Sequence, residues 1–119
     1  MAVGAAGGPK IVSAVVQALV NFIDFGLGIK VSVDAPRLHC HGQKVEVESG
    51  ISLAVQSQLS DMGHDIMKVE SIALLQMIYK SASGWEGASD PRGPGRASIL
   101  IEEEGHIVAR DFGYSNTQV

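Results

Sequence analysis

The uncharged apolar run of residues 11–25 constrains the fold of this chain more than any other segment. Its apolar residues recur at three- and four-residue spacing, which predicts a helix of about four turns with a broad buried face. They are Ile11, Val12, Val15, Val16, Leu19, Val20, Phe22 and Ile23. Pro9 suits the first turn of this helix, because proline lacks the N–H that a first turn leaves unpaired. Gly26 or Gly28 suits the left-handed residue that ends it.

The same run is too short and too polar to be a membrane span. Gln17, Asn21 and Asp24 interrupt the apolar stretch of residues 11–27, which is shorter than the roughly 20 residues that cross a bilayer. No cluster of basic residues and no small-residue cleavage motif accompanies it, as a signal peptide would require. We therefore expect a buried helix, no transmembrane segment and no signal peptide, and the sequence assigns no compartment.

The charge of the chain excludes two classes of partner. The 119 residues carry 9 basic and 13 acidic side chains, for a formal net charge of -4. No cluster of lysine or arginine provides the positive patch that nucleic acid or anionic lipid requires. We expect neither nucleic acid nor a membrane as a partner. The single cysteine, Cys40, excludes an internal disulfide framework.

The remaining segments alternate between strand and helix patterns. Residues 29–36 fit either a short strand or a short second helix that ends before Pro36. Residues 52–63 predict a second long helix, with Ser52 as its cap, Gly63 as its stop and an apolar face. That face consists of Leu53, Val55, Leu59 and Met62.

Strand patterns dominate elsewhere. Alternating or continuous apolar residues predict strands over residues 43–49, 65–71, 72–84 and 85–89, the second and third joined by a tight link near Glu70. Residues 90–96 have the Gly and Pro content of a surface loop. Residues 97–112 predict a two-strand extension that turns at Glu104 and Gly105, and residues 113–119 predict a frayed tail. The sequence therefore predicts an α+β domain, with helices packed on an antiparallel or mixed sheet.

Four phrases in a fixed order resemble a known family. They are "GAAGGPKI", "VNFIDFGLGIKVSVDAPRLH", "LSDMGHDI" and "EGASDPRGPGRA". Together they are similar to the C-terminal part of the small subunit of gamma-glutamyltranspeptidases (gamma-glutamyltransferases), enzymes of the N-terminal-nucleophile (Ntn) hydrolase superfamily. The resemblance covers residues 4–97. It implies a partial Ntn-hydrolase-like layered arrangement, with a domain at residues 1–97 and an extension and tail at residues 98–119.

The resemblance also implies a chemistry and a site. In that family a threonine hydroxyl attacks a gamma-glutamyl amide, as in glutathione, and the acyl group then passes to water or to an acceptor amine. Two adjacent glycines donate backbone N–H groups to the oxyanion of the tetrahedral intermediate. By resemblance these glycines are Gly7 and Gly8. Ala5 and Ala6 stand where the family usually has Ser or Ala followed by Pro, and Pro9 and Lys10 replace a small polar residue and an arginine.

No stretch of the sequence resembles the segment that begins with the threonine nucleophile. The serines and the aspartate that grip the substrate also precede the matched part of the family. We therefore expect this chain to be inactive alone, to meet a gamma-glutamyl substrate only in an intact assembly with a complementary subunit, and to need no cofactor or metal. The alternative is a non-catalytic association module, which forms a homo-oligomer or completes a partner subunit.

Several residues have a structural interpretation beside a functional one. Gly7 and Gly8 also fit a flexible leader before the helix. Residues 39–41, His-Cys-His, have ligand types that bind transition metals, but the sequence supplies no second ligand pair nearby, so we favour no metal site and a semi-buried thiol at Cys40. Trp85 fits an interface or the core.

Two Asp-Arg pairs flank prolines in the phrases that carry the resemblance. Asp34 with Arg37, and Asp90 with Arg92, are each expected either to pair with each other or to fix the loop, in an architectural rather than a catalytic role. Residues 102–104, three glutamates, are expected to form a solvated turn.

Overall fold

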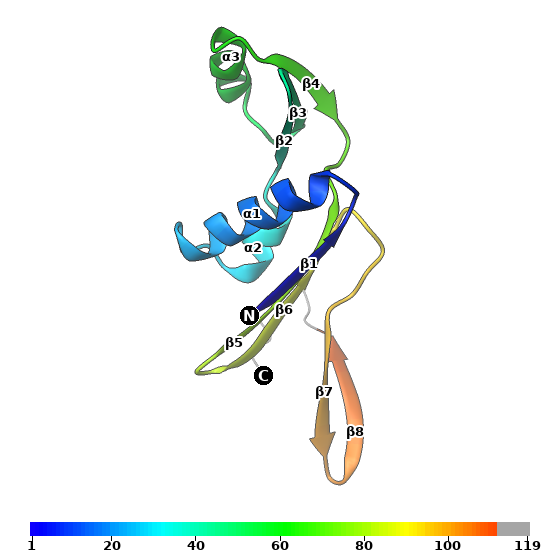
Figure 1. Cartoon of the computed structure of the whole chain (residues 1–119). Coiled ribbons are helices and arrows are strands. Elements are labelled where there is room, and N and C mark those ends of the chain that lie inside the picture. Colours follow the sequence, from blue (N-terminus) through cyan, green and yellow to red (C-terminus); the bar gives the residue numbers. More distant parts are fainter. Residues whose placement is uncertain (112–119) are drawn as a thin grey trace.

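The computed structural model describes residues 1–111. Its elements form an α+β arrangement (Figure 1), which confirms the predicted fold class. The helices are α1 (Lys10–Ile23), α2 (Ile29–Asp34) and α3 (Leu53–Asp61). The strands are β1 (Ala2–Ala6), β2 (Leu38–His41), β3 (Lys44–Glu48), β4 (Asp65–Val69), β5 (Leu74–Ser81), β6 (Gly84–Ser89), β7 (Ser98–Glu103) and β8 (His106–Asp111).

A sheet covered by two helices forms the body of the molecule. Strand β5 lies between β1 and β6, and both neighbours run antiparallel to it. Helices α1 and α2 pack side by side on one face of this sheet (Figure 1). The core between them consists of Ala14, Ala18, Ile29, Val33, Leu75, Met77 and Ala88. Residues 29–34, which the pattern left open, are thus helical, because Ile29 and Val33 lie one turn apart and both face the sheet.

A second sheet lies beyond the helices. Strand β3 pairs with β2 antiparallel and with β4 parallel, and α3 connects β3 to β4. The strands β4 and β5 follow each other in sequence but belong to different sheets. The predicted tight link near Glu70 therefore joins two sheets.

Helix α3 has its predicted ends but not its predicted buried face. The Ser52 hydroxyl accepts a hydrogen bond from the Val55 N–H at 3.3 Å, and Gly63 has a positive φ of 94°. However, Leu53 and Met62 are 72% and 74% exposed, so the expectation of an apolar core face on this helix is wrong within this chain.

Strands β7 and β8 form the expected two-strand extension, which projects away from the body (Figure 1). Glu104 and Gly105 both have positive φ, 52° and 79°. This is the geometry of a two-residue hairpin turn whose twist matches that of the flanking strands. The predicted tail, residues 113–119, lies outside the described residues.

The molecule is elongated. Its radius of gyration is 16.6 Å and its extents are 61 × 25 × 20 Å, whereas a compact domain of this length has a radius of gyration of about 13–14 Å. Much apolar surface is consequently exposed. Within residues 1–111, no helix has the length and apolar character to cross a membrane.

Candidate functional site

Gly7 and Gly8 form the turn between β1 and α1. Their φ angles are 144° and 61°, in the region that only glycine adopts without strain. The Gly7 carbonyl accepts a hydrogen bond from the Lys10 N–H at 3.3 Å, and the Gly8 carbonyl accepts one from the Ile11 N–H at 3.1 Å. The turn is therefore ordered by the first turn of α1, and the flexible-leader interpretation does not describe it.

The N–H groups of Gly7 and Gly8 donate no hydrogen bond within residues 1–111. Helix α1 begins after Pro9 without a side-chain cap and without an acidic residue in its first turn. An uncapped helix start concentrates positive partial charge, and adjacent free N–H groups add to it. The turn can therefore donate hydrogen bonds to a negatively charged oxygen.

Gly7 is packed against the corner that leads into β5. A Cβ built on Gly7 would lie 2.8 Å from the Ala73 Cα, whereas one built on Gly8 would meet nothing within 4 Å. Ala73 itself has a positive φ of 59°. Residues 72–75, which comprise the end of the link from β4 and the first two residues of β5, are called the 72–75 corner. Gly7 is thus required by close packing, and Gly8 by its backbone conformation alone.

A buried ion-pair network lies behind the 72–75 corner. It consists of Arg37, Glu48, Asp90 and Arg92. The Arg37 guanidinium Nη2 lies 2.8 Å from Asp90 Oδ2. Arg92 bonds both carboxylates, with Nη2 at 2.5 Å from Glu48 Oε2 and Nη1 at 3.0 Å from Asp90 Oδ1.

The network lowers the pKa of both of its carboxyl groups. Burial alone would raise the pKa of Glu48, but hydrogen bonds from Arg92 and from the N–H groups of Arg37 and Ile72 bring it below its ordinary value. Burial opposes the same change in Asp90, whose pKa is lowered by bonds from Arg92, Arg37 and the Leu75 N–H. The bond to Glu48, followed by the bond to Asp90, raises the pKa of Arg92 against the effect of burial. Glu48, Asp90 and Arg92 are therefore charged at neutral pH.

One of the two Asp-Arg sets pairs locally and the other does not. Asp90 pairs with Arg92 as predicted. Asp34 instead pairs with Lys30 one helical turn away, and Arg37 turns inward to Asp90. Residue 90 is only 1% exposed, so the predicted surface loop begins with a buried anchor.

Sequence reasoning missed Glu48. Glu48 is the last residue of β3. The alternation of this strand predicts that its charged residues face solvent, yet Glu48 is only 5% exposed. A glutamate at the end of the predicted strand at residues 43–49, followed directly by Ser49 and Gly50, offers no local sign of burial. Its position is explained by partners distant in sequence, namely the Arg92 guanidinium and the N–H groups of Arg37 and Ile72.

Residues 39–41 are divided between the interior and the surface. His39 is buried, and its Nδ1 lies 2.8 Å from the Ser13 Oγ on α1. Cys40 is exposed, not semi-buried as predicted, and its thiol donates to the Gly42 carbonyl at 3.2 Å. Within residues 1–111, no group of three or more His, Cys, Asp or Glu side chains is arranged to hold a metal ion.

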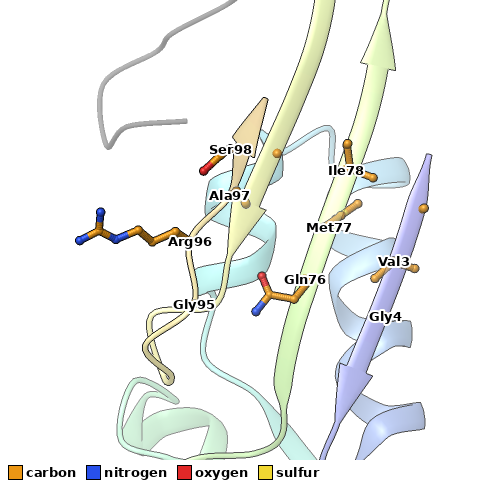
Figure 2. A pocket seen from close by; sticks show the side chains of 12 residues that line it. Val3, Gly4, Gln76, Met77, Ile78, Gly95, Arg96, Ala97 and Ser98 are labelled. Carbon is orange, nitrogen blue, oxygen red and sulfur yellow. The ribbon is translucent and has the colours of Figure 1, made fainter. Parts of the chain in front are cut away.

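A cavity of about 560 Å³ lies along the β1-β5-β6 sheet. Since Leu75 and Met77 face the helices, the alternate residues Gln76 and Ile78 project from the other face. Residues 95–98 close one side of this cavity, and Gln76 points towards Gly95 (Figure 2). The sheet face opposite the helices is therefore only partly covered.

Comparisons with known proteins agree with this geometry. The family model described as gamma-glutamyltranspeptidase matches residues 1–100. The chain belongs to the gamma-glutamyltranspeptidase family. The matched part contains both the Gly7–Gly8 turn and the ion-pair network.

Individual relatives support the family assignment. The chain is 35% identical over 92 residues to the glutathione hydrolase proenzyme of Escherichia coli, which covers 75% of this chain and 16% of that protein. Its structure is similar to that of gamma-glutamyltranspeptidase from Pseudomonas nitroreducens, with a TM-score of 0.75 and 26% identity, over 84% of this chain and 54% of that one. It is also similar to cephalosporin acylase from Bacillus halodurans, with a TM-score of 0.71 and 30% identity, over 76% of this chain and 18% of that one.

Each similarity covers a larger share of this chain than of the protein to which it is compared. Most of this chain is matched, but it spans only about a sixth of the E. coli relative. The fold is consequently that of one part of a gamma-glutamyltranspeptidase, an Ntn hydrolase, as predicted.

Proposed function

We propose that this gamma-glutamyltranspeptidase-related chain supplies the oxyanion-binding turn of a gamma-glutamyl transfer or hydrolysis site. Gly7 and Gly8 would donate their N–H groups to the oxygen that becomes negative when a nucleophile attacks the gamma-glutamyl carbonyl. The observation that carries the proposal is a pair of adjacent N–H groups at an uncapped helix start, neither of which donates a hydrogen bond within residues 1–111. Such preorganised donors stabilise the tetrahedral intermediate more than the substrate.

The attacking group is proposed to come from outside residues 1–119. The chain contains a single threonine, Thr117, in a context unlike that of the family nucleophile. In an intact assembly the threonine hydroxyl would add to the gamma-glutamyl carbonyl while its own amine accepts the proton. The C–N bond of the substrate amide would then break as the leaving amine takes this proton, and water or an acceptor amine would release the acyl group from the threonine oxygen. The chain alone is expected to be inactive.

An assay with a gamma-glutamyl anilide tests this function. Purified chain alone should release no p-nitroaniline from gamma-glutamyl-p-nitroanilide. Co-expression with the E. coli glutathione hydrolase proenzyme lacking its matched 92 residues should restore release if this chain provides the missing part. Turnover by the purified chain alone would contradict the proposed absence of a nucleophile, and a folded complex without turnover would contradict the proposed oxyanion role.

A matched pair of glycine variants makes the test specific. Gly8→Ala strains a left-handed residue (φ 61°), and Gly26→Ala strains one of nearly the same φ (64°) at the other end of α1. An added Cβ meets nothing within 4 Å at either position. We expect Gly8→Ala to lower kcat by roughly ten- to a hundredfold, because it displaces an oxyanion donor. Gly26→Ala should leave kcat within about twofold, since it costs only backbone strain.

A second candidate function is association without catalysis. The partly covered face of the β1-β5-β6 sheet, opposite the helices, exposes Leu74, Ile78 and Trp85 by 37%, 39% and 40%. The outer side of α1 exposes Val12 and Val16 by 69% and 51%. Exposed apolar side chains gathered on one face favour a contact site, and they favour an interface for Trp85.

Sedimentation velocity tests association. The purified chain at micromolar concentration is expected to form a dimer or larger species, or to join the truncated relative in a stable complex. Ile78→Glu should weaken either assembly, because it places a charge on the sheet face opposite the helices. A chain that sediments as a monomer at high concentration and does not bind the truncated relative would contradict this candidate.

A further inference from the structure

Side chains of the ion-pair network hold the backbone of the 72–75 corner. Arg37 Nη1 donates to the carbonyls of Ile72 and Ala73 at 3.0 and 3.3 Å. Glu48 Oε1 accepts from the Ile72 N–H at 2.7 Å. Residues 72 and 73 are thus fixed by side chains from distant segments, before the regular pairing of β5 begins at Leu74.

A third bond fixes the other end of the corner. Asp90 Oδ2 accepts from the Leu75 N–H at 2.8 Å while it also pairs with Arg37. Between these anchored residues lies Ala73, whose positive φ a non-glycine residue adopts only when its surroundings impose it. The network is therefore what keeps Ala73 in this conformation.

Ala73 in turn forms the surface on which Gly7 lies. The last register pair of β1 and β5 is Ala6 with Leu74, so the strand that leads into the glycine turn ends beside the corner. Beyond that pair, the position of the turn depends on contact between the Gly7 backbone and Ala73. This contact leaves no room for a Cβ on residue 7. A shift of Ala73 would consequently shift Gly7.

We propose that Arg37 and Glu48 are positioning residues for the Gly7–Gly8 turn, acting through the backbone of the 72–75 corner. This inference rests on the proposed oxyanion role for its consequence in catalysis. Oxyanion donors must be held to within about 0.5 Å of the productive geometry. A fully paired network of buried charges is rigid, because displacement of any one side chain weakens several hydrogen bonds at once. Such a network can therefore hold the donors in place.

Backbone dynamics measured by NMR on the full chain test the coupling. In the unchanged protein the amides of Gly7 and Gly8 should have rigid order parameters, near 0.85. Arg37→Lys removes the forked bonds to the corner and should lower both values to below about 0.6. Val45→Ala, which creates a cavity in the second sheet, is the control for a general loss of stability. It should leave the order parameters of Gly7 and Gly8 unchanged. Unchanged order parameters in Arg37→Lys, with altered amide shifts in the corner, would overturn the proposal.

Milder variants keep the test decisive if Arg37→Lys does not fold. Glu48→Gln retains the shape of the side chain but weakens its bonds to the corner, and should shift the amide resonances of Ala73 and Gly7 together. In the reverse direction, Gly7→Ala should shift the amides of the corner, whereas Gly8→Ala should not, because only the first meets Ala73. Equal corner shifts from both glycine variants, or no shift at Gly7 in Glu48→Gln, would overturn the proposal.

These measurements need no turnover, so the two proposals fail separately. A turn that responds as expected in a complex without p-nitroaniline release would contradict only the proposed function. In an active complex, Arg37→Lys should lower kcat by about tenfold or more with KM within about threefold, as expected when only transition-state contacts are lost. A rise in KM alone would assign the network to substrate binding instead, against the positioning role.

Discussion

The guanidinium of Arg37 and the carboxylate of Asp90 form an ion pair that is almost completely withdrawn from solvent. Nη2 and Oδ2 are 2.8 Å apart, and the two side chains are 2% and 0% exposed. Each residue comes from one of the two Asp-Arg motifs that carry the family resemblance. The pair therefore joins the segment after α2 to the segment after β6. The remaining hydrogen bonds of Arg37 go to backbone carbonyls, whereas Asp90 also accepts from the Leu75 N–H and from Arg92.

Removal of one partner of this pair should destabilise the fold strongly. Asp90→Ala leaves the Arg37 charge buried without its partner and the Leu75 N–H without its acceptor. We expect a loss of about 3–5 kcal/mol in the free energy of unfolding, measured by urea denaturation. Asp34→Ala, which breaks the exposed pair with Lys30, should cost less than about 1 kcal/mol. Similar losses in the two variants would contradict a buried, structural Asp90.

Stability should decrease in acid because of the same network. The folded-state pKa values of Glu48 and Asp90 lie below their ordinary values, so the unfolded chain takes up protons first as the pH falls. The stabilisation from these groups is complete above the ordinary carboxyl pKa of about 4, and is lost as the pH falls through the lower folded-state values.

Urea denaturation between pH 7 and pH 2.5 measures this dependence. Glu48→Gln should lose stability at pH 7 and show a shallower decrease below about pH 4 than the unchanged chain, since one titrating group has been removed. Glu102→Gln, on the exposed hairpin, is the control and should keep the original slope. Parallel curves for all three proteins would exclude Glu48 as a contributor to the acid dependence.

Local periodicity predicted much of the fold because it depends on neighbours in sequence. The spacing of apolar residues located α1, and the turn residues Glu104 and Gly105 located the β7-β8 hairpin. Ser52 and Gly63 similarly marked the ends of α3. Each of these signals is complete within a few residues, so no tertiary information is needed to interpret it.

Features that depend on residues distant in sequence could not be predicted from local patterns. The burial of Glu48 follows from Arg92, and the inward turn of Arg37 follows from Asp90. The exposed apolar residues of α3 have the pattern of a core face, but no element of residues 1–111 covers Leu53 or Met62. A pattern identifies a surface that favours burial without identifying what buries it.

Gln17 should prove important for the junction of the two sheets. Its amide bridges α1 to β2, with Nε2 donating to the Leu38 carbonyl at 2.7 Å and Oε1 accepting from the Leu38 N–H at 3.0 Å. Gln17→Ala removes both bonds, and we expect a loss of about 1–3 kcal/mol in the free energy of unfolding. The control is Gln58→Ala on the exposed side of α3, which should change stability by less than about 0.5 kcal/mol. A neutral Gln17→Ala would mean that water replaces the bridge without cost.

Removal of residues 98–119 should leave the body of the protein folded. Strands β7 and β8 pair chiefly with each other, and the ion pair between Arg96 and Asp111 is exposed, at 3.5 Å. An isolated two-strand hairpin contributes little stability of its own. The truncated chain should therefore unfold within a few degrees of the full chain in a thermal melt followed by circular dichroism, because a change of about 0.5 kcal/mol shifts the Tm by only a few degrees. A much lower Tm would show that the extension is part of the same cooperative unit, and would contradict a domain boundary near residue 97.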